Sequence, residues 1–207
     1  MLGSATTIFI PGPVGALETW VEEPSALPER GVLVILHPNP LQGGSNRNKV
    51  VYALVKAGVQ EGYRVFAPNL RGVGLSEGRH DKGKGEVDDV LAIIQYVREE
   101  FPGVPLSLGG FSFGGYLAIL VASHFKDFHR LILVGAAVGL YEKPVPALAK
   151  GIRVLIVHGE KDEIVPLSNL LSWADPQNLA ITVFPGTGHF FHRKLVLLRT
   201  TVAAFLA

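Results

Sequence analysis

The sequence predicts an α/β protein with a mainly parallel sheet of about seven to eight strands and helices on both faces. Continuous apolar runs, such as residues 31–37 and 129–135, are typical of parallel strands that are buried on both sides. Segments with apolar residues three or four positions apart, such as 86–101, lie between such runs and predict helices. Because strands and helices alternate over the whole chain, we expect a single domain over residues 1–207.

The composition narrows the functional class. A chain of 207 residues is long enough to bury a substantial core, and its net charge of +1 gives no reason to expect a nucleic-acid partner. Without cysteine, the chain has no disulfide and no thiol nucleophile. The seven histidines are scattered, so no metal or other cofactor is expected.

The start of the chain lacks the basic residues of a secretory signal, and the longest apolar stretch, 131–140, is far too short to span a membrane. We therefore expect a cytoplasmic protein without a membrane partner. The oligomeric state is left open.

The first two strands are expected at residues 7–10 and 17–22, on either side of Pro11-Gly12-Pro13. Further strands are expected at 31–37, 63–68, the run before Ser112, 129–135, 152–158 and 179–184. Helices are expected from Asn46 or Asn48 to Gly62, then at 86–101, after Ser112, at 167–173 and at 190–206.

Ser112 lies in the pattern Gly-x-Ser-x-Gly, between an apolar run that predicts a strand and one that predicts a helix. In a nucleophile elbow of this kind, the serine is held on a strained turn and its hydroxyl stands clear of the sheet edge. Gly110 and Gly114 suit the close approach of strand and helix. The pattern predicts that Ser112 is a nucleophile.

A serine nucleophile needs a base and an acid, which follow it in the order acid, then histidine, in this arrangement. His189 follows the last predicted strand in a glycine-rich turn and is the predicted base, while His192 lies one helical turn further on. Asp162, which follows the strand at 152–158, is the predicted acid, and Glu160 and Glu163 are its alternatives.

The oxyanion of the transition state needs two backbone donors. Phe113 N–H, directly after the serine, is one. The loop that follows His37 is expected to supply the other, and because Pro38 and Pro40 have no N–H, Asn39 is the predicted donor and Leu41 the fallback. These segments all follow strands, and ligands of parallel sheets bind at the carboxyl ends of the strands.

Together these motifs resemble the α/β-hydrolase fold over nearly the full chain. The segments 37–49, 71–78 and 110–114 are similar to those of small, capless bacterial hydrolases of the dienelactone-hydrolase and esterase branch. Many of that group have His-Pro-His-Pro where this chain has Asn39, and dienelactone hydrolases proper use cysteine. The resemblance implies no cap domain, because only residues 135–151 separate two predicted strands where a cap is usually inserted.

The predicted function is that of a serine hydrolase which cleaves small-molecule carboxylic esters with short acyl groups through an acyl-enzyme. A shallow, open pocket is expected, with a rim formed by His37, Leu41, Val138, Leu140 and Phe190. Thioesterase, amidase or peptidase activity uses the same groups and stays open, as does a catalytically silent binding protein on the same fold.

Overall fold

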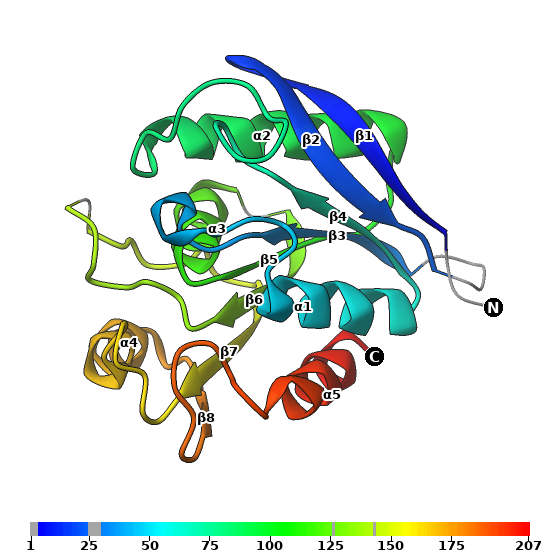
Figure 1. Cartoon of the computed structure of the whole chain (residues 1–207). Coiled ribbons are helices and arrows are strands. Elements are labelled where there is room, and N and C mark those ends of the chain that lie inside the picture. Colours follow the sequence, from blue (N-terminus) through cyan, green and yellow to red (C-terminus); the bar gives the residue numbers. More distant parts are fainter. Residues whose placement is uncertain (1–3, 25–29, 126, 143) are drawn as a thin grey trace.

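The computed structural model describes residues 4–24, 30–125, 127–142 and 144–207, which form one eight-stranded sheet in the order β1-β2-β4-β3-β5-β6-β7-β8 (Figure 1). The strands are β1 (Ala5–Gly12), β2 (Gly15–Glu22), β3 (Gly31–Leu36), β4 (Tyr63–Pro68), β5 (Leu106–Phe111), β6 (Phe128–Val134), β7 (Arg153–Gly159) and β8 (Thr182–Phe184). Strands β3 to β8 run parallel to one another, and β2 pairs antiparallel with both β1 and β4.

Five α-helices are described: α1 (Lys49–Gln60), α2 (Lys84–Glu100), α3 (Phe113–His124), α4 (Leu167–Ala174) and α5 (Leu195–Leu206). Two short 3₁₀ turns, η1 (Pro40–Gln42) and η2 (Asp175–Gln177), complete the regular structure of the described residues. In the described part of the chain, no helix has both the length and the apolar character needed to cross a membrane.

The hydrophobic core lies on both faces of the sheet, as the continuous apolar strands predict. One face packs against α2 and α3 through residues such as Ile93, Val97 and Leu117, all of which are buried. The other face packs against α1 and α5, with Leu54 and Val202 among its buried residues. Figure 1 shows α1 and α5 side by side on that face.

The N-terminal hairpin is longer than predicted. β1 continues through Pro11 to Gly12, where it pairs with the first residue of β2. Proline is tolerated there because β1 is an edge strand, so the missing N–H removes no bond to a further strand.

The predicted closing helix at 190–206 begins five residues too early. Phe191 and Arg193 have φ angles of 52° and 61°, in the left-handed region, so residues 190–194 form tight turns and α5 begins at Leu195. The turns place Phe191 in the core against the ring of Phe184 and leave Phe190 at the surface. The predicted strand at 179–184 is likewise reduced to the three residues of β8.

The connection between β6 and β7 contains no helix or strand in its described residues, 135–142 and 144–152. No folded lid therefore stands over the carboxyl ends of the strands in this part of the chain. The edge of the sheet at which β3, β5, β7 and β8 end is the place where the predicted site residues meet.

Candidate active site

Ser112 lies on a strained turn between β5 and α3. Its φ of 55° and ψ of −115° are unusual for a residue with a side chain, and such strain is concentrated at functional sites. The turn is possible because its neighbours are glycines: a Cβ at Gly110 would collide with the backbone of Gly114, and one at Gly114 with the carbonyl of Leu36. In this conformation the Ser112 hydroxyl points toward His189, in the loop after β8.

His189 joins Ser112 to Asp162. Its Nε2 lies 2.9 Å from Ser112 Oγ, and its Nδ1 lies 2.7 Å from Asp162 Oδ2. An ionised carboxylate only accepts hydrogen bonds, so Nδ1 donates its proton to Asp162 and Nε2 accepts the hydroxyl proton of Ser112. The imidazole is thus in the tautomer that a general base requires.

The carboxylate of Asp162 is held in its charged form. Its Oδ1 accepts hydrogen bonds from the N–H groups of Ile164 and Val165, at 3.0 and 2.8 Å. Burial raises the pKa of Asp162, but the hydrogen bonds from His189 and Val165 outweigh burial and leave that pKa below its usual value. Asp162 is therefore ionised at neutral pH.

His158 lies under this pair and was not predicted to contact it. Its Nε2 donates to the carbonyl of Val165 at 2.9 Å and lies 3.5 Å from Asp162 Oδ2. Burial lowers the pKa of His158, so the ring is neutral at neutral pH. In the sequence, the one indication of this contact is that His158 lies four residues before Asp162.

The alternatives to these residues lie elsewhere. Glu160 accepts a hydrogen bond from Gly186 N–H and is exposed, while Glu163 has its carboxylate near Gly188. His192 is exposed and its ring packs against Phe190. The structure brings Ser112, His189 and Asp162 together and leaves the three alternatives outside their hydrogen bonds.

The two predicted oxyanion donors are backbone N–H groups that the described part of the fold leaves without an acceptor. Within the described ranges, neither Phe113 N–H nor Asn39 N–H has a hydrogen-bond acceptor. Leu41 N–H, the fallback, already donates to Asn39 Oδ1 at 2.9 Å. This geometry favours Asn39 over Leu41 as the second predicted oxyanion donor.

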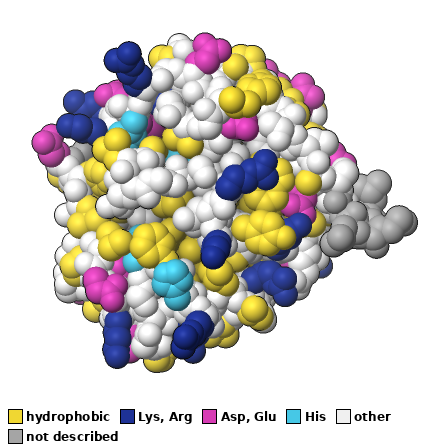
Figure 2. All heavy atoms as spheres, viewed as in Figure 1, with side chains coloured by type: hydrophobic (Ala, Val, Ile, Leu, Met, Phe, Trp, Pro, Cys, Tyr) yellow, Lys and Arg dark blue, Asp and Glu magenta, His cyan; other side chains and the backbone are white. Residues whose placement is uncertain are grey.

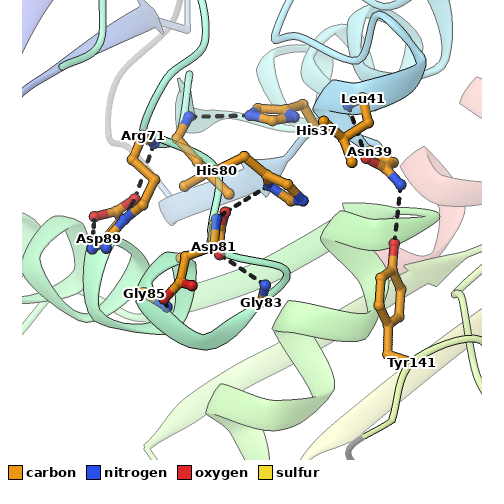
Figure 3. Close-up of polar contacts among 12 residues, drawn as sticks. His37, Asn39, Leu41, Arg71, His80, Asp81, Gly83, Gly85, Asp89 and Tyr141 are labelled. Carbon is orange, nitrogen blue, oxygen red and sulfur yellow. Dashed lines mark hydrogen bonds and ion pairs between the residues drawn. The ribbon is translucent and has the colours of Figure 1, made fainter. Parts of the chain in front are cut away.

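The loop that carries Asn39 is held by its side chain (Figure 3). Asn39 caps the turn η1 through Leu41 N–H, and its Nδ2 reaches the hydroxyl of Tyr141 at 3.4 Å. Burial raises the pKa of Tyr141 to about 12, so that hydroxyl stays protonated. The aromatic ring of Tyr141 packs against Phe113, with ring centroids 5.3 Å apart.

The prediction that His37 belongs to the pocket rim is wrong. His37 is wholly buried, and both of its ring nitrogens are used by the backbone: Nε2 accepts from Leu70 N–H at 3.1 Å, and Nδ1 donates to the Pro38 carbonyl at 2.7 Å (Figure 3). Burial lowers the pKa of His37 to about 4. Val138 is also buried and lies in the core, whereas Leu41, Leu140 and Phe190 are exposed.

The long loop after β4 is held by two buried side-chain contacts with carboxylates of α2 that the sequence did not reveal. Arg71 forms a two-pronged contact with Asp89 of α2, with distances of 2.9 and 2.7 Å. His80, which Figure 3 labels, has its Nδ1 2.6 Å from the buried carboxylate of Glu86. Its ring packs edge-on against Phe113. In the sequence, nothing distinguishes Glu86 and Asp89 from acidic residues on the solvent-exposed face of a helix.

No three metal-ligating side chains cluster among the residues that the structure describes. The site as it stands contains a serine hydroxyl that is hydrogen-bonded to an imidazole, which a carboxylate holds in place.

Comparison with known proteins adds to this geometry. Residues 31–152, more than half of the chain, match the family model of the α/β hydrolase fold. An uncharacterized protein of Rickettsia prowazekii (strain Madrid E) is 30% identical over 204 residues, which cover 90% of this chain and 82% of the relative.

Two solved structures are similar over nearly the whole chain. An α-β serine hydrolase homologue from Coxiella burnetii is 35% identical, with a TM-score of 0.90 and coverage of 98% of this chain and 97% of its own. A protein from Xanthomonas campestris, described as an α/β serine hydrolase without a lid, is 34% identical, with a TM-score of 0.86 and coverage of 98% and 94%.

Proposed function

The chain belongs to the α/β-hydrolase fold family, and on that basis we propose that it is a serine hydrolase that cleaves carboxylic esters with small or short-chain acyl groups. The observation that carries the proposal is the hydrogen-bonded series Ser112–His189–Asp162, with the serine on its strained turn. Relatives described as serine hydrolases support the same reaction class.

In the proposed mechanism, Ser112 Oγ attacks the ester carbonyl while His189 Nε2 takes the hydroxyl proton. The resulting imidazolium is stabilised by the adjacent carboxylate of Asp162, which remains ionised. His189 then gives the proton to the departing alcohol, and an acyl-enzyme on Ser112 remains. A water molecule, activated by the same imidazole, releases the carboxylic acid and restores Ser112.

The negative charge on the carbonyl oxygen is proposed to be bound by the N–H groups of Phe113 and Asn39. Removal of one oxyanion donor typically slows such enzymes by about 100-fold to 1,000-fold. Asn39 is well suited because its own side chain fixes the turn η1, so its N–H is held in place before substrate binds.

The preference for short acyl groups is proposed from the packing around Phe113. Its buried ring contacts those of His80 and Tyr141, with centroid distances of 5.4 and 5.3 Å, and we propose that these three rings limit the space for an acyl group beside Ser112. Access is provided from the exposed side, where Leu41, Leu140 and Phe190 lie at the surface.

The test is labelling of the folded protein with a fluorophosphonate probe and location of the adduct by mass spectrometry. We expect one adduct, on Ser112, that disappears in Ser112→Ala and on denaturation. Ser123→Ala is the matched control, because Ser123 lies on α3 and its hydroxyl donates to the Leu120 carbonyl. A folded protein that never reacts would overturn the proposal in favour of a silent binding protein.

The leaving group is tested next, with matched short-chain esters, thioesters and anilides. The proposal expects the ester to have the highest kcat/KM. A thioester or amide that is turned over faster than its ester would replace the ester assignment while retaining the serine mechanism.

A further inference from the structure

A groove lies between α1 and α5, on the face of the sheet opposite α2 and α3. Its volume is about 420 Å³, which is within the usual range of small-molecule sites. It is lined by Arg47, Lys49, Tyr52, Ala53, Lys56, Leu195, Val196 and Arg199. None of these residues takes part in the proposed catalysis, so an inference about the groove does not rest on the proposed function.

The groove is strongly cationic. Half of its lining residues are lysine or arginine and none is acidic. Lys56 is paired with the buried carboxylate of Glu22. In the portion of the chain with described positions, no carboxylate pairs with Arg47, Lys49 or Arg199. Three positively charged residues therefore line the groove without a carboxylate partner, and of these Arg47 has its guanidinium over the Trp20 ring, 5.3 Å from the ring centroid.

The groove also exposes apolar surface beside these charges. Tyr52 is 51% exposed and Val196 is 72% exposed, and Figure 2 shows lysine and arginine side chains interspersed with hydrophobic ones over α1 and α5. The ring of Tyr52 is braced from below, because it stacks on Trp20 at 5.9 Å, and Lys56 lies over it at 5.2 Å. These two contacts orient the Tyr52 side of the groove.

Unpaired cations around a concave apolar surface suit a ligand that is both anionic and apolar. We propose that the groove binds a small amphipathic anion, with an apolar chain against Tyr52, Leu195 and Val196 and a carboxylate or phosphate head group at Lys49 and Arg199. The concave shape favours a free ligand over a flat membrane surface. The lining of the groove contains none of the residues of the proposed catalytic site.

Calorimetric titration tests the site with decanoate and decyl phosphate, each below its critical micelle concentration. We expect saturable binding of at least one of them, and none of acetate or decanol, which each supply only half of the chemistry. Lys49→Glu and Arg199→Glu are each expected to weaken binding about 25-fold, since a single cation near an anionic group contributes about a fivefold effect and charge reversal doubles that free energy, which squares the fold-change.

Matched variants separate the groove from a general charge effect. Lys150→Glu makes the same change in net charge at an exposed residue outside the groove and should bind like the unmodified chain. Val196→Asp should abolish binding, whereas Leu197→Asp, on the same helix but outside the lining, should have a much smaller effect. Fluorophosphonate labelling of Ser112 should be the same in all of them, which keeps this test distinct from that of the proposed function.

Several results would overturn the proposal. Equal affinity in Lys49→Glu, Arg199→Glu and Lys150→Glu would place the ligand elsewhere, including at Ser112. Absence of binding by both probes would leave the groove without an amphipathic ligand. Association with vesicles of anionic phospholipid, without saturable binding of either free probe, would identify a membrane contact instead.

Discussion

His189 and His37 are both buried histidines that follow the carboxyl end of a parallel strand, and they differ in what their rings contact. Both nitrogens of His37 are bonded to backbone groups, of Pro38 and Leu70. His189 is bonded to two side chains, a carboxylate on one side and a serine hydroxyl on the other. The two histidines therefore share burial and a position at the carboxyl edge of the sheet. Only their hydrogen-bond partners distinguish a structural histidine from a candidate base.

The difference also appears in what each ring can do with a proton. A proton on His37 would have to displace the N–H of Leu70, and burial without a carboxylate lowers its pKa to about 4. At His189, Asp162 lies against Nδ1, so a proton taken up at Nε2 is stabilised by a nearby negative charge. The comparison predicts that His189 acts in catalysis and His37 in folding.

The largest expected effect is on catalysis, in Ser112→Ala and His189→Gln. Each should lower kcat for a short-chain ester by about 10⁴-fold or more, because either change removes the nucleophile or its base. Thermal unfolding should stay cooperative in both variants. His192→Gln is the control and should retain activity, since its ring is exposed and packs on Phe190. Full activity of His189→Gln would show that His189 is not the catalytic base and would contradict the contrast with His37.

Asp162→Asn should reduce kcat by about 10³-fold to 10⁴-fold, because an amide at this position favours the wrong imidazole tautomer. Glu160→Gln and Glu163→Gln remove the same charge from neighbouring positions and should change kcat less than about threefold, in keeping with carboxylates that do not contact His189. The kinetic constants of the three variants with one ester decide between them, and a larger loss in either glutamate variant would reassign the acid.

His37 should have its largest effect on the pH dependence of stability. Its pKa is about 4 in the folded protein and about 6.5 in the unfolded chain, so the unfolded chain binds the proton first as pH falls. The contribution is fully present above pH 6.5 and is lost between pH 6.5 and 4. The free energy of unfolding should therefore fall by about 2 kcal/mol from this ring between pH 7.5 and 5.

Urea unfolding of the unmodified chain and of His37→Gln at the two pH values measures the contribution of His37 to the free energy of unfolding. Glutamine does not titrate, so the variant should be less stable at pH 7.5 but should lose less stability at pH 5. Its kcat at pH 7.5 should be close to that of the unmodified chain. An unchanged pH slope would mean that His37 does not carry the buried titration.

The fold could be predicted largely because its signals are local. The strand at 63–68 was predicted with the bounds that β4 has, since a glycine precedes it and an apolar run fills it. The late start of α5 was missed because the left-handed angles of Phe191 and Arg193 are imposed by packing of Phe191 against Phe184 and not by the residue types. The parallel sheet and its helices on both faces were confirmed.

The site residues could be predicted where a motif fixes their order in the chain. They could not be predicted where a side chain contacts a residue that is distant in the sequence. The motif around Ser112 led to His189 and Asp162, whose catalytic roles stay predictions. The rim assignment of His37 failed because its partner, Leu70, lies on another loop and has no signature in the sequence. The contacts of Glu86 and Asp89 were missed for the same reason, because their partners, His80 and Arg71, lie in the loop after β4.

The smallest expected effect concerns the donor loop after His37, through Asn39→Ala. The change leaves the backbone N–H of residue 39 in place but removes the acceptor for Leu41 N–H, which costs about 1 kcal/mol at a helical cap. A less firmly held N–H should lower kcat by about fivefold, with little change in KM, because the oxyanion forms only in the transition state. Asn39→Ser keeps a capping oxygen and should recover most of the rate.

Tyr141→Phe removes only the longer contact, of 3.4 Å, between Tyr141 and Asn39, and should lower kcat less than Asn39→Ala or Asn39→Ser does. If Asn39→Ala raised KM and left kcat unchanged, the loop would bind substrate without stabilising the oxyanion, and the second donor would have to be sought elsewhere.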